Sequence, residues 1–427
     1  MSLLTQWDNL VAAARGLSLM AVEKVETGIV YNPMDATLRS DPYPFYTRLR
    51  QADPFHRCRN ADGWVLSRYA DVLEVLRDSA FSADERNHRR FGHIVKRLER
   101  AGLPEPYADD RGSMLRLDPP DHTRLRGLVA KAFTPRAVER MRPRIEAILK
   151  ELLESRPAKG PMELVTELAS PLPVRVIAEM IGVPPEDHAR FRDWSNEAVR
   201  SLGGDTIEDH QAAARANRQL DRYFEAIIDA RRQAPKDDLI SALVAAEDAG
   251  DRLKRGEMLS TLTLLLIAGN ETTTNLIANA TLALLRNPEQ LEILRREPEK
   301  VPGAIDELLR YDSPVQMTSR VALEDRELHG KRVRRGDQII LLLGSANRDP
   351  DVFQNADRLD VTRSDVRHLA FSHGVHFCLG AQLARLEAGL ALQGLIERFP
   401  SFKLLPQEVP WRTNMILRGP KSVWLDL

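Results

Sequence analysis

The stretch Phe371-Ser-His-Gly-Val-His-Phe-Cys-Leu-Gly380 decides which fold this chain is expected to adopt. Glycines lie on both sides of Cys378, and the apolar spacing that follows predicts a helix from Ala381 onward. A cysteine just before a helix lies where backbone N–H groups and the helix dipole stabilise a thiolate, the anionic form that binds metals. The glycines permit close approach to a flat ligand. The alternative is an ordinary small buried thiol, which is the commoner role of a lone intracellular cysteine.

Composition narrows the class of protein around this stretch. The 427 residues carry 61 Lys and Arg against 62 Asp and Glu, so bulk charge supports neither nucleic-acid binding nor attachment to a membrane surface. Two cysteines, Cys58 and Cys378, make a secreted disulfide scaffold improbable and exclude an iron–sulfur cluster held by four thiolates. The N-terminus has no signal-peptide pattern, and no apolar run approaches the roughly 20 residues that span a bilayer. We therefore expect a cytoplasmic protein.

Apolar periodicity predicts a predominantly α fold with a small β-sheet region. Helical spacing recurs along the chain, for example over 138–152 and 220–228. Strand-like pieces are short and far apart: 54–58, 63–67, 315–321 and 327–343, the last with a turn at His329-Gly330. Loops are expected at 101–112, 156–161, 202–209 and 233–238. Because no linker or repeat separates these segments, one domain is expected.

A second unusual stretch lies inside a predicted helix from Glu257 to Arg286. Its first half is apolar enough for burial on all sides, yet it contains Gly269, which costs about 1 kcal/mol of helix propensity. Glu271 and Thr272 then place polar groups beside a buried run. Such local conflicts tend to mark functional sites. The alternative is a glycine used for packing and a glutamate that faces solvent.

Together, these two stretches resemble the cytochrome P-450 family. Phe371-x-x-Gly374-x-His376-x-Cys378-x-Gly380 is similar to its haem-binding signature. The resemblance implies that Cys378 supplies the axial thiolate to the iron of haem b, with Gly380 in the same signature. It also implies that Phe371 packs beside this ligand and that His376 lies near a haem propionate. Electron donation from the thiolate would favour cleavage of the O–O bond of dioxygen.

The helical stretch, in turn, resembles the family's oxygen-activation motif. Ala268-Gly269-x-Glu271-Thr272 matches that motif on the opposite side of the haem. The resemblance implies that Ala268 and Gly269 leave room for dioxygen. It also implies that Glu271 connects the site to solvent protons and that Thr272 holds a water or the bound oxygen by a hydrogen bond, as general acid–base groups do.

A third pattern, Glu307-Leu-Leu-Arg310, places an acid and a base on one helix face. Such pairs are common and contribute little when exposed. Its place between the first two motifs nevertheless matches the Glu-x-x-Arg element of the family. The resemblance implies a structural network with one further arginine, for which Arg358 is the predicted partner.

A fourth pattern opens a helix after the turn at 118–121. His122 and Arg126 share one face of that helix. The resemblance implies that both bind haem propionates together with Arg320. The alternative is a solvated basic face.

The segment 124–144 contains seven Lys or Arg against one acid, Glu139. The chain has no iron–sulfur cluster and no dinucleotide-binding motif, so its electrons must come from another protein. We expect an acidic ferredoxin or flavodoxin, itself reduced by an NAD(P)H-dependent reductase, to bind this basic segment. Arg136 and Arg140 are the residues whose charge reversal tests this.

The resemblance extends from residue 32 to 427, so the chain is expected to form one haem-thiolate monooxygenase domain after an N-terminal extension, 1–31. Such an enzyme uses dioxygen to hydroxylate or epoxidise an apolar small molecule, such as a fatty acid, terpenoid, steroid or polyketide. The expected pocket is lined by the following segments: 82–117, 165–209, 314–318 (with Val315 and Met317), and the loop at Met415 and Ile416. Two alternatives remain: a peroxygenase or isomerase on the same fold, and a non-enzymatic haem sensor or carrier.

Overall fold

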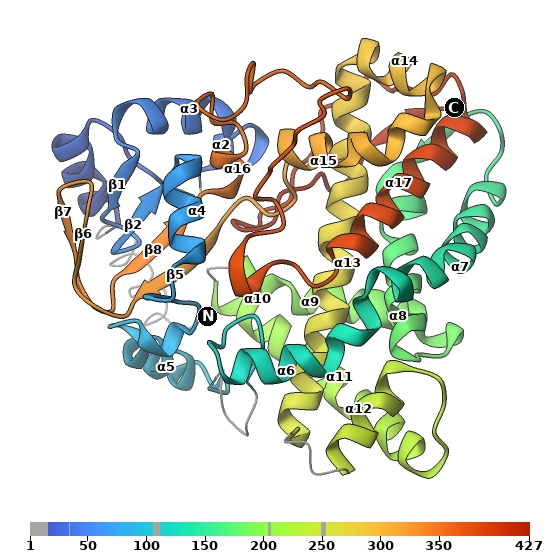
Figure 1. The fold of residues 1–427 in the computed structure, drawn as a ribbon, viewed down its shortest axis with the longest axis horizontal. Coiled ribbons are helices and arrows are strands. Elements are labelled where there is room, and N and C mark those ends of the chain that lie inside the picture. Colours follow the sequence, from blue (N-terminus) through green and yellow to red (C-terminus); the bar gives the residue numbers. More distant parts are fainter. Residues whose placement is uncertain (1–15, 34, 106–111, 204–205, 249–252) are drawn as a thin grey trace, which may run out of the picture.

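A long central helix organises the structure. The computed structural model describes residues 16–427 except 34, 106–111, 204–205 and 249–252. Helix α13 (Arg255–Arg286) crosses the middle of the helical part (Figure 1) and packs against α8 (Pro171–Ile181), α9 (His188–Ala198), α11 (Ile207–Gln233), α15 (Val301–Tyr311) and α17 (Ala381–Arg398). Most of α13 is buried on every face. The apolar run of the sequence therefore reflects a core helix.

The remaining helices surround this core. They are α2 (Ala36–Ser40), α3 (Tyr43–Ala52), α4 (Tyr69–Arg77), α5 (Phe91–Arg100), α6 (Asp121–Ala130), α7 (Pro135–Glu154), α10 (Arg200–Gly203), α12 (Leu239–Asp248), α14 (Pro288–Arg296) and α16 (Leu343–Ala346). Short helical turns are η1 (Glu85–Asn87), η3 (Lys131–Phe133), η4 (Val165–Ala169), η5 (Pro185–Asp187), η6 (Pro298–Lys300) and η7 (Gly374–His376). The prediction of a predominantly helical chain is confirmed.

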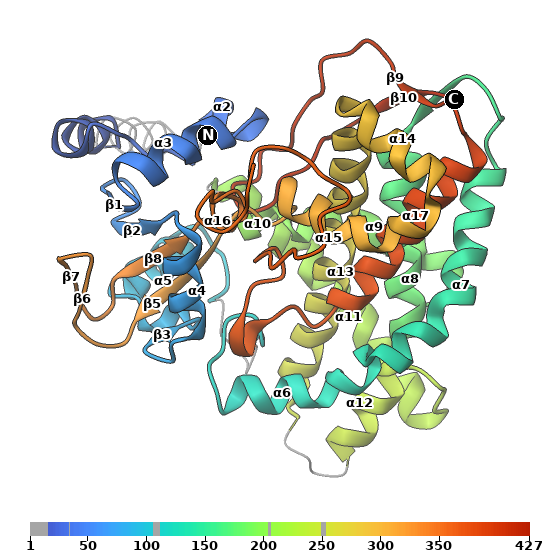
Figure 2. The same cartoon turned by 45° about the horizontal axis from the view of Figure 1, so that its top comes forward.

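The main sheet lies to one side of the long helices, as Figure 2 shows. Its strand order is β1 (Phe55–Cys58), β2 (Gly63–Leu66), β8 (Gln338–Leu341), β5 (Thr318–Ala322) and β3 (Phe81–Ser82). Only β2 and β8 pair in parallel. Strands β6 (Arg326–Leu328) and β7 (Lys331–Val333) form a hairpin whose turn residues have φ angles of 52° at His329 and 69° at Gly330. The predicted turn is thus confirmed.

A second sheet joins remote parts of the chain. Strand β10 (Trp424–Asp426) pairs with β4 (Pro161–Glu163) and with β9 (Lys403–Leu404). Strands of two or three residues carry too little periodicity for sequence analysis, which did not predict this sheet. The loop predicted over 202–209 is also wrong in part, because α10 continues to Gly203 and α11 begins at Ile207.

The described part of the N-terminal segment contacts the main sheet. Residues 16–27 are helical, and Glu23, which is fully buried, lies 2.8 Å from His56 Nε2. The same carboxylate accepts hydrogen bonds from the backbone N–H groups of Tyr31 and Arg59, both at 2.7 Å. The 31/32 domain boundary stays a prediction. The described residues of this segment nevertheless pack onto strand β1.

Candidate active site

The loop before α17 presents Cys378 in a fixed backbone. The Cys378 N–H donates to the Phe371 carbonyl at 2.9 Å, and the Phe377 N–H donates to the Gly374 carbonyl at 3.0 Å. Gly374 has a φ of 71°, and a Cβ there would lie 2.6 Å from the Leu76 carbonyl oxygen, so only glycine fits. Both cysteines are free thiols, Cys58 buried and Cys378 partly buried. Burial raises the pKa of the Cys378 thiol, while a hydrogen bond from the Gly380 backbone and the charges of Arg126 and Arg385 oppose that rise.

Two histidines and two arginines gather next to this loop. His122 and Arg126 come from α6, Arg320 from β5 and His376 from η7. The rings of His122 and His376 lie 4.3 Å apart, and Arg126 Nη2 donates to the Phe377 carbonyl at 2.7 Å. Burial, reinforced by the charges of Arg320, His122 and Arg126, lowers the pKa of His376 to about 3. Burial lowers the pKa of Arg320 to about 10. The structure thus brings four residues of the predicted site together.

The charge of Asp118 acts on Arg320 and His122, but the cluster has no ion pair among the described residues. Within the described residues, His122 Nδ1 and His376 Nε2 are buried without a hydrogen-bond partner. Arg320 has no ion pair in the same part of the chain; it donates to the Ser319 carbonyl at 2.8 Å and to Thr318 Oγ1 at 3.5 Å. A buried polar atom without a partner costs about 1–3 kcal/mol, so such atoms are usually paired in the functional state. A dianionic group bound between these residues would pair them, which is the role that the resemblance to the cytochrome P-450 family implies for the haem propionates.

The motif residues of α13 lie on different faces of the helix. Thr272 Oγ1 donates to the Ala268 carbonyl at 2.6 Å, so these two residues share one face. Ala268 is exposed, although its helix is otherwise largely buried. The Cβ direction of Gly269 instead points at Ile177 Cγ1 of α8, 3.3 Å away. The open face is therefore formed by Ala268 and Thr272, and Gly269 allows α13 to pack closely on α8.

Glu271 has a partner that sequence analysis did not predict. Its side chain is 4% exposed, and Arg412 Nη1 lies 3.1 Å from its carboxylate. Burial raises the pKa of Glu271, while the charge of Arg412 opposes that rise. Glu271 thus has no wide contact with solvent of its own, and Arg412, 26% exposed, lies between it and the surface. A cavity of about 30 Å³ lies beside Arg412 and is lined also by Tyr31, Gln316 and Met415, which is room for about one water.

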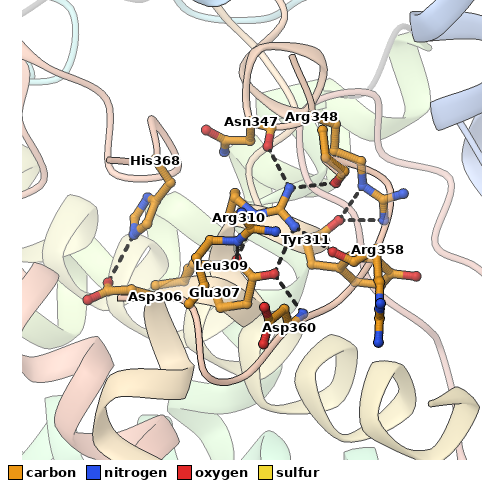
Figure 3. A network of polar contacts seen from close by, with 12 residues as sticks. Asp306, Glu307, Leu309, Arg310, Tyr311, Asn347, Arg348, Arg358, Asp360 and His368 are labelled. Carbon is orange, nitrogen blue, oxygen red and sulfur yellow. Dashed lines mark hydrogen bonds and ion pairs between the residues drawn. The ribbon is translucent and has the colours of Figure 1, made fainter. Parts of the chain in front are cut away.

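Glu307 and Arg310 form the ion pair that the family resemblance implied, and the structure shows that both side chains are fully buried (Figure 3). Arg310 Nε lies 2.6 Å from Glu307. The predicted third partner needs a correction. Arg358 contributes only its backbone carbonyl, which accepts from Arg310 at 3.0 Å, while its own side chain is exposed. The side chain that reaches Glu307 is Arg363, at 3.1 Å, because the chain turns back toward α15 between these two arginines.

Three of the seven cations in the basic segment 124–144 form ion pairs, two of them with acids from other helices. Arg124 pairs with Glu257 and Arg144 with Glu179 at 2.6 Å, while Arg142 pairs with Glu139. The expected continuous patch is therefore reduced. Cations of this segment for which the described structure gives no ion pair are Lys131, Arg136 and Arg140, together with Arg126 beside the cysteine loop.

Two of the four predicted pocket segments, 314–318 and the loop at Met415 and Ile416, are in contact. Val315 forms a β-bridge with Leu417, and the Gln316 N–H donates to the Ile416 carbonyl at 2.8 Å. Met317, Met415 and Ile416 belong to one apolar cluster. Part of the predicted segment 82–117, residues 106–111, lies outside the described residues.

Comparison with known proteins decides the family. The sequence model of the cytochrome P-450 family matches residues 194–425, more than half of the chain. PksS of Bacillus subtilis, a polyketide biosynthesis cytochrome P-450, is 39% identical over 408 residues, which cover 93% of this chain and 99% of PksS. This chain belongs to the cytochrome P-450 family. As the sequence predicted, it is a haem-thiolate monooxygenase with the haem cofactor of that family.

Further relatives agree with this assignment. Vitamin D(3) 25-hydroxylase of Pseudonocardia autotrophica is 41% identical over 389 residues, covering 90% of this chain and 93% of that enzyme. The solved structure of P450BioI with an acyl carrier protein ligated to hexadec-9Z-enoic acid superposes with a TM-score of 0.83 at 36% identity, covering 92% of this chain and 100% of that one. Among the helices of the described ranges, none is long and apolar enough to cross a membrane. As a member of this family, the P-450 uses redox partners and a substrate.

Proposed function

We propose that Cys378 is the axial ligand of the haem iron and that His122, Arg126, Arg320 and His376 bind the two haem propionates. The observation that carries this proposal is the set of buried, unpaired polar atoms next to a free thiol at a helix N-terminus. Haem bound there supplies the iron at which dioxygen is activated. The side chain of Phe371 packs against this loop, and its carbonyl holds the Cys378 N–H.

On the opposite side of the haem, we propose that Thr272 and Glu271 deliver protons during turnover. The Thr272 hydroxyl lies on the open face of α13, where it can turn from the Ala268 carbonyl to a bound water or oxygen. Glu271 is the neighbouring acid, and its ion pair with Arg412 keeps a carboxylate available within a buried helix. Ala268 is exposed on the same face as Thr272, and its small side chain would leave room for dioxygen beside a bound haem.

The proposed substrate is an apolar small molecule with a polyketide, fatty-acyl, terpenoid or steroid skeleton. The apolar cluster at Met317, Met415 and Ile416 suits such a molecule. The named relatives add support, since PksS belongs to polyketide biosynthesis and another relative is a vitamin D(3) hydroxylase. A screen of these classes for the haem spin-state shift identifies the substrate. Hydroxylated or epoxidised product that requires dioxygen then tests the reaction.

We propose that electrons arrive from an acidic ferredoxin or flavodoxin served by an NAD(P)H-dependent reductase in the cytoplasm, where both thiols stay reduced. The donor would bind the cations that remain unpaired, Lys131, Arg136 and Arg140. Reversal of charge at Arg136 and Arg140 is expected to slow reduction and to flatten its salt dependence. Reversal at Arg142, which is already paired with Glu139, is the matched control. Equal rates in all variants would contradict this docking site.

The carbonyl complex of the reduced protein tests the ligand directly. A strongly red-shifted Soret band is expected for the wild type and its loss for Cys378→Ser. A wild-type band without that shift would overturn the thiolate assignment. Turnover with peroxide alone, without dioxygen or reductant, would instead indicate the peroxygenase.

A further inference from the structure

Asp306 connects three segments around the cysteine loop. It precedes Glu307 on α15, but its carboxylate serves different partners: its Oδ1 lies 3.0 Å from His368 Nε2 and 2.8 Å from Arg385 Nε. Figure 3 shows the contact with His368 beside the Glu307–Arg310 pair. Although burial opposes it, hydrogen bonds from His368 and Arg385 keep the pKa of Asp306 below its ordinary value. Asp306 is therefore a carboxylate shared by two donors.

The histidine of this cluster has a defined orientation. Its side chain is 3% exposed, and His368 Nδ1 accepts a hydrogen bond from the Ala370 N–H at 3.1 Å. Because Nδ1 is an acceptor, Nε2 carries the proton and donates it to Asp306. The imidazole ring lies 5.5 Å from the ring of Phe371. Asp306 thus fixes the orientation of the His368 ring, which borders the Phe371 ring on one side.

Arg385 completes the arrangement. Its guanidinium carbon lies 4.6 Å from the centroid of the Phe371 ring, within the range of a cation–π contact. The backbone carbonyl of Phe371 in turn accepts the Cys378 N–H at 2.9 Å. Arg385 and Arg126 are the two cations whose charge acts on the Cys378 sulfur. Asp306 therefore holds a positive charge next to Phe371, whose carbonyl accepts the backbone N–H of the proposed iron ligand.

We propose that Asp306 is a positioning residue that fixes Arg385 over Phe371, and that the guanidinium charge held there raises the reduction potential of the haem iron. The inference rests on the proposed function, because it takes Cys378 as the ligand. Reduction adds an electron to the iron–thiolate unit, so a fixed nearby cation stabilises the reduced form more than the oxidised one. A partly exposed arginine without an anchor would sample other rotamers and lose this effect.

The test is the reduction potential of the holoprotein, measured without a redox partner. Arg385→Met keeps an unbranched, flexible side chain, although a shorter one, and removes its charge. We expect the reduction potential to fall by about 30–59 mV for this one-electron couple. This corresponds to a roughly three- to tenfold change in the ferric-to-ferrous ratio at a fixed applied potential. Arg385→Lys retains a charge and should recover part of the shift. Arg398→Met is the matched control, because Arg398 lies over Phe399 (5.3 Å) at the far end of the same helix.

The sign of the shift in Asp306→Ala separates positioning from simple neutralisation. If Asp306 holds Arg385 in place, its removal lowers the potential in the wild type and does not lower it in the Arg385→Met background. If Asp306 acts only through its own negative charge, its removal raises the reduction potential both in the wild type and in Arg385→Met, which overturns the inference. An unchanged potential in Arg385→Met overturns it as well. In both cases a red-shifted carbonyl Soret band shows that the thiolate assignment, and hence the proposed function, still stands.

Discussion

The two sides of the haem site differ in how completely the protein satisfies its own polar groups. Behind the cysteine loop, Glu307 and Arg310 are fully buried, and the Arg310 guanidinium also donates to three backbone carbonyls. On α13, Glu271 has one cationic partner among the described residues, and in the same part of the chain the Thr272 hydroxyl bonds to the Ala268 carbonyl of its own helix. Buried networks that are complete are rigid, whereas groups with spare bonding capacity can change partners. On the proposed assignment, the ligand side is thus held by the protein, and the oxygen side is left available for substrate, water and protons.

The largest effect is expected from breaking the complete network. Glu307→Ala leaves the Arg310 charge buried without its partner and should reduce the free energy of unfolding by about 3–5 kcal/mol. Denaturant unfolding of the holoprotein measures this loss. Arg363→Ala should cost a smaller amount, and Arg358→Ala, whose side chain is exposed, should change stability by less than about 0.5 kcal/mol. Equal effects of the two arginine variants would contradict the placement of Arg363.

On the oxygen side, changes should affect turnover and leave stability nearly unchanged. Thr272→Val removes the hydroxyl that we propose directs protons, and product formation should fall about 10²-fold while oxygen consumption continues and releases peroxide. The ratio of product to oxygen consumed measures this. Thr281→Val is the matched control, because Thr281 makes the same bond to the carbonyl four residues before it, at 2.8 Å, farther along α13. Equal loss in both variants would point to a helix effect instead.

Glu387, on the ligand side, differs from Glu307 and Arg310 because one of its buried oxygens has no partner among the described residues. Glu387 of α17 is 2% exposed, its Oε2 has no partner among the described residues, and burial raises its pKa to about 8. Between its unfolded pKa near 4.5 and about 8, the folded state binds the extra proton, so stability should fall as the pH rises through this window. Glu387→Gln, which stays neutral, should flatten this dependence and be about 1–2 kcal/mol more stable than the wild type at pH 8. Parallel stability curves against pH would contradict this.

The smallest effect is expected at Arg412. Arg412→Gln removes the charge that holds down the pKa of Glu271, so this pKa should rise. The rise in product formation that depends on ionised Glu271 should then occur at a higher pH than in the wild type. Arg412→Lys should keep the wild-type profile. A profile unchanged in Arg412→Gln would show that Glu271 titrates without influence on proton supply.

Sequence analysis succeeded where the chemistry is local. The cysteine signature and Glu307-x-x-Arg310 each lie within one short segment, so their spacing alone fixes a shared loop or helix face. The adjacent residues Glu271 and Thr272 of α13 instead have different partners. Sequence analysis failed where two arginines are close in sequence and only one turns inward, as with Arg358 and Arg363. It also overstated the basic patch, because counting charges along a helix cannot reveal that Glu179 and Glu257 approach from other helices.

The sequence by itself therefore determined the family, the metal ligand to be tested and the order of the motifs, because these depend on residue type and short-range spacing. Only the tertiary structure decided which partners complete the site: Arg412 beside Glu271, and Arg385 beside Asp306, which is 79 positions away in the chain. The physical reason is that burial makes each such pair matter, while local periodicity indicates which face of one segment is buried and does not encode which distant segments come together.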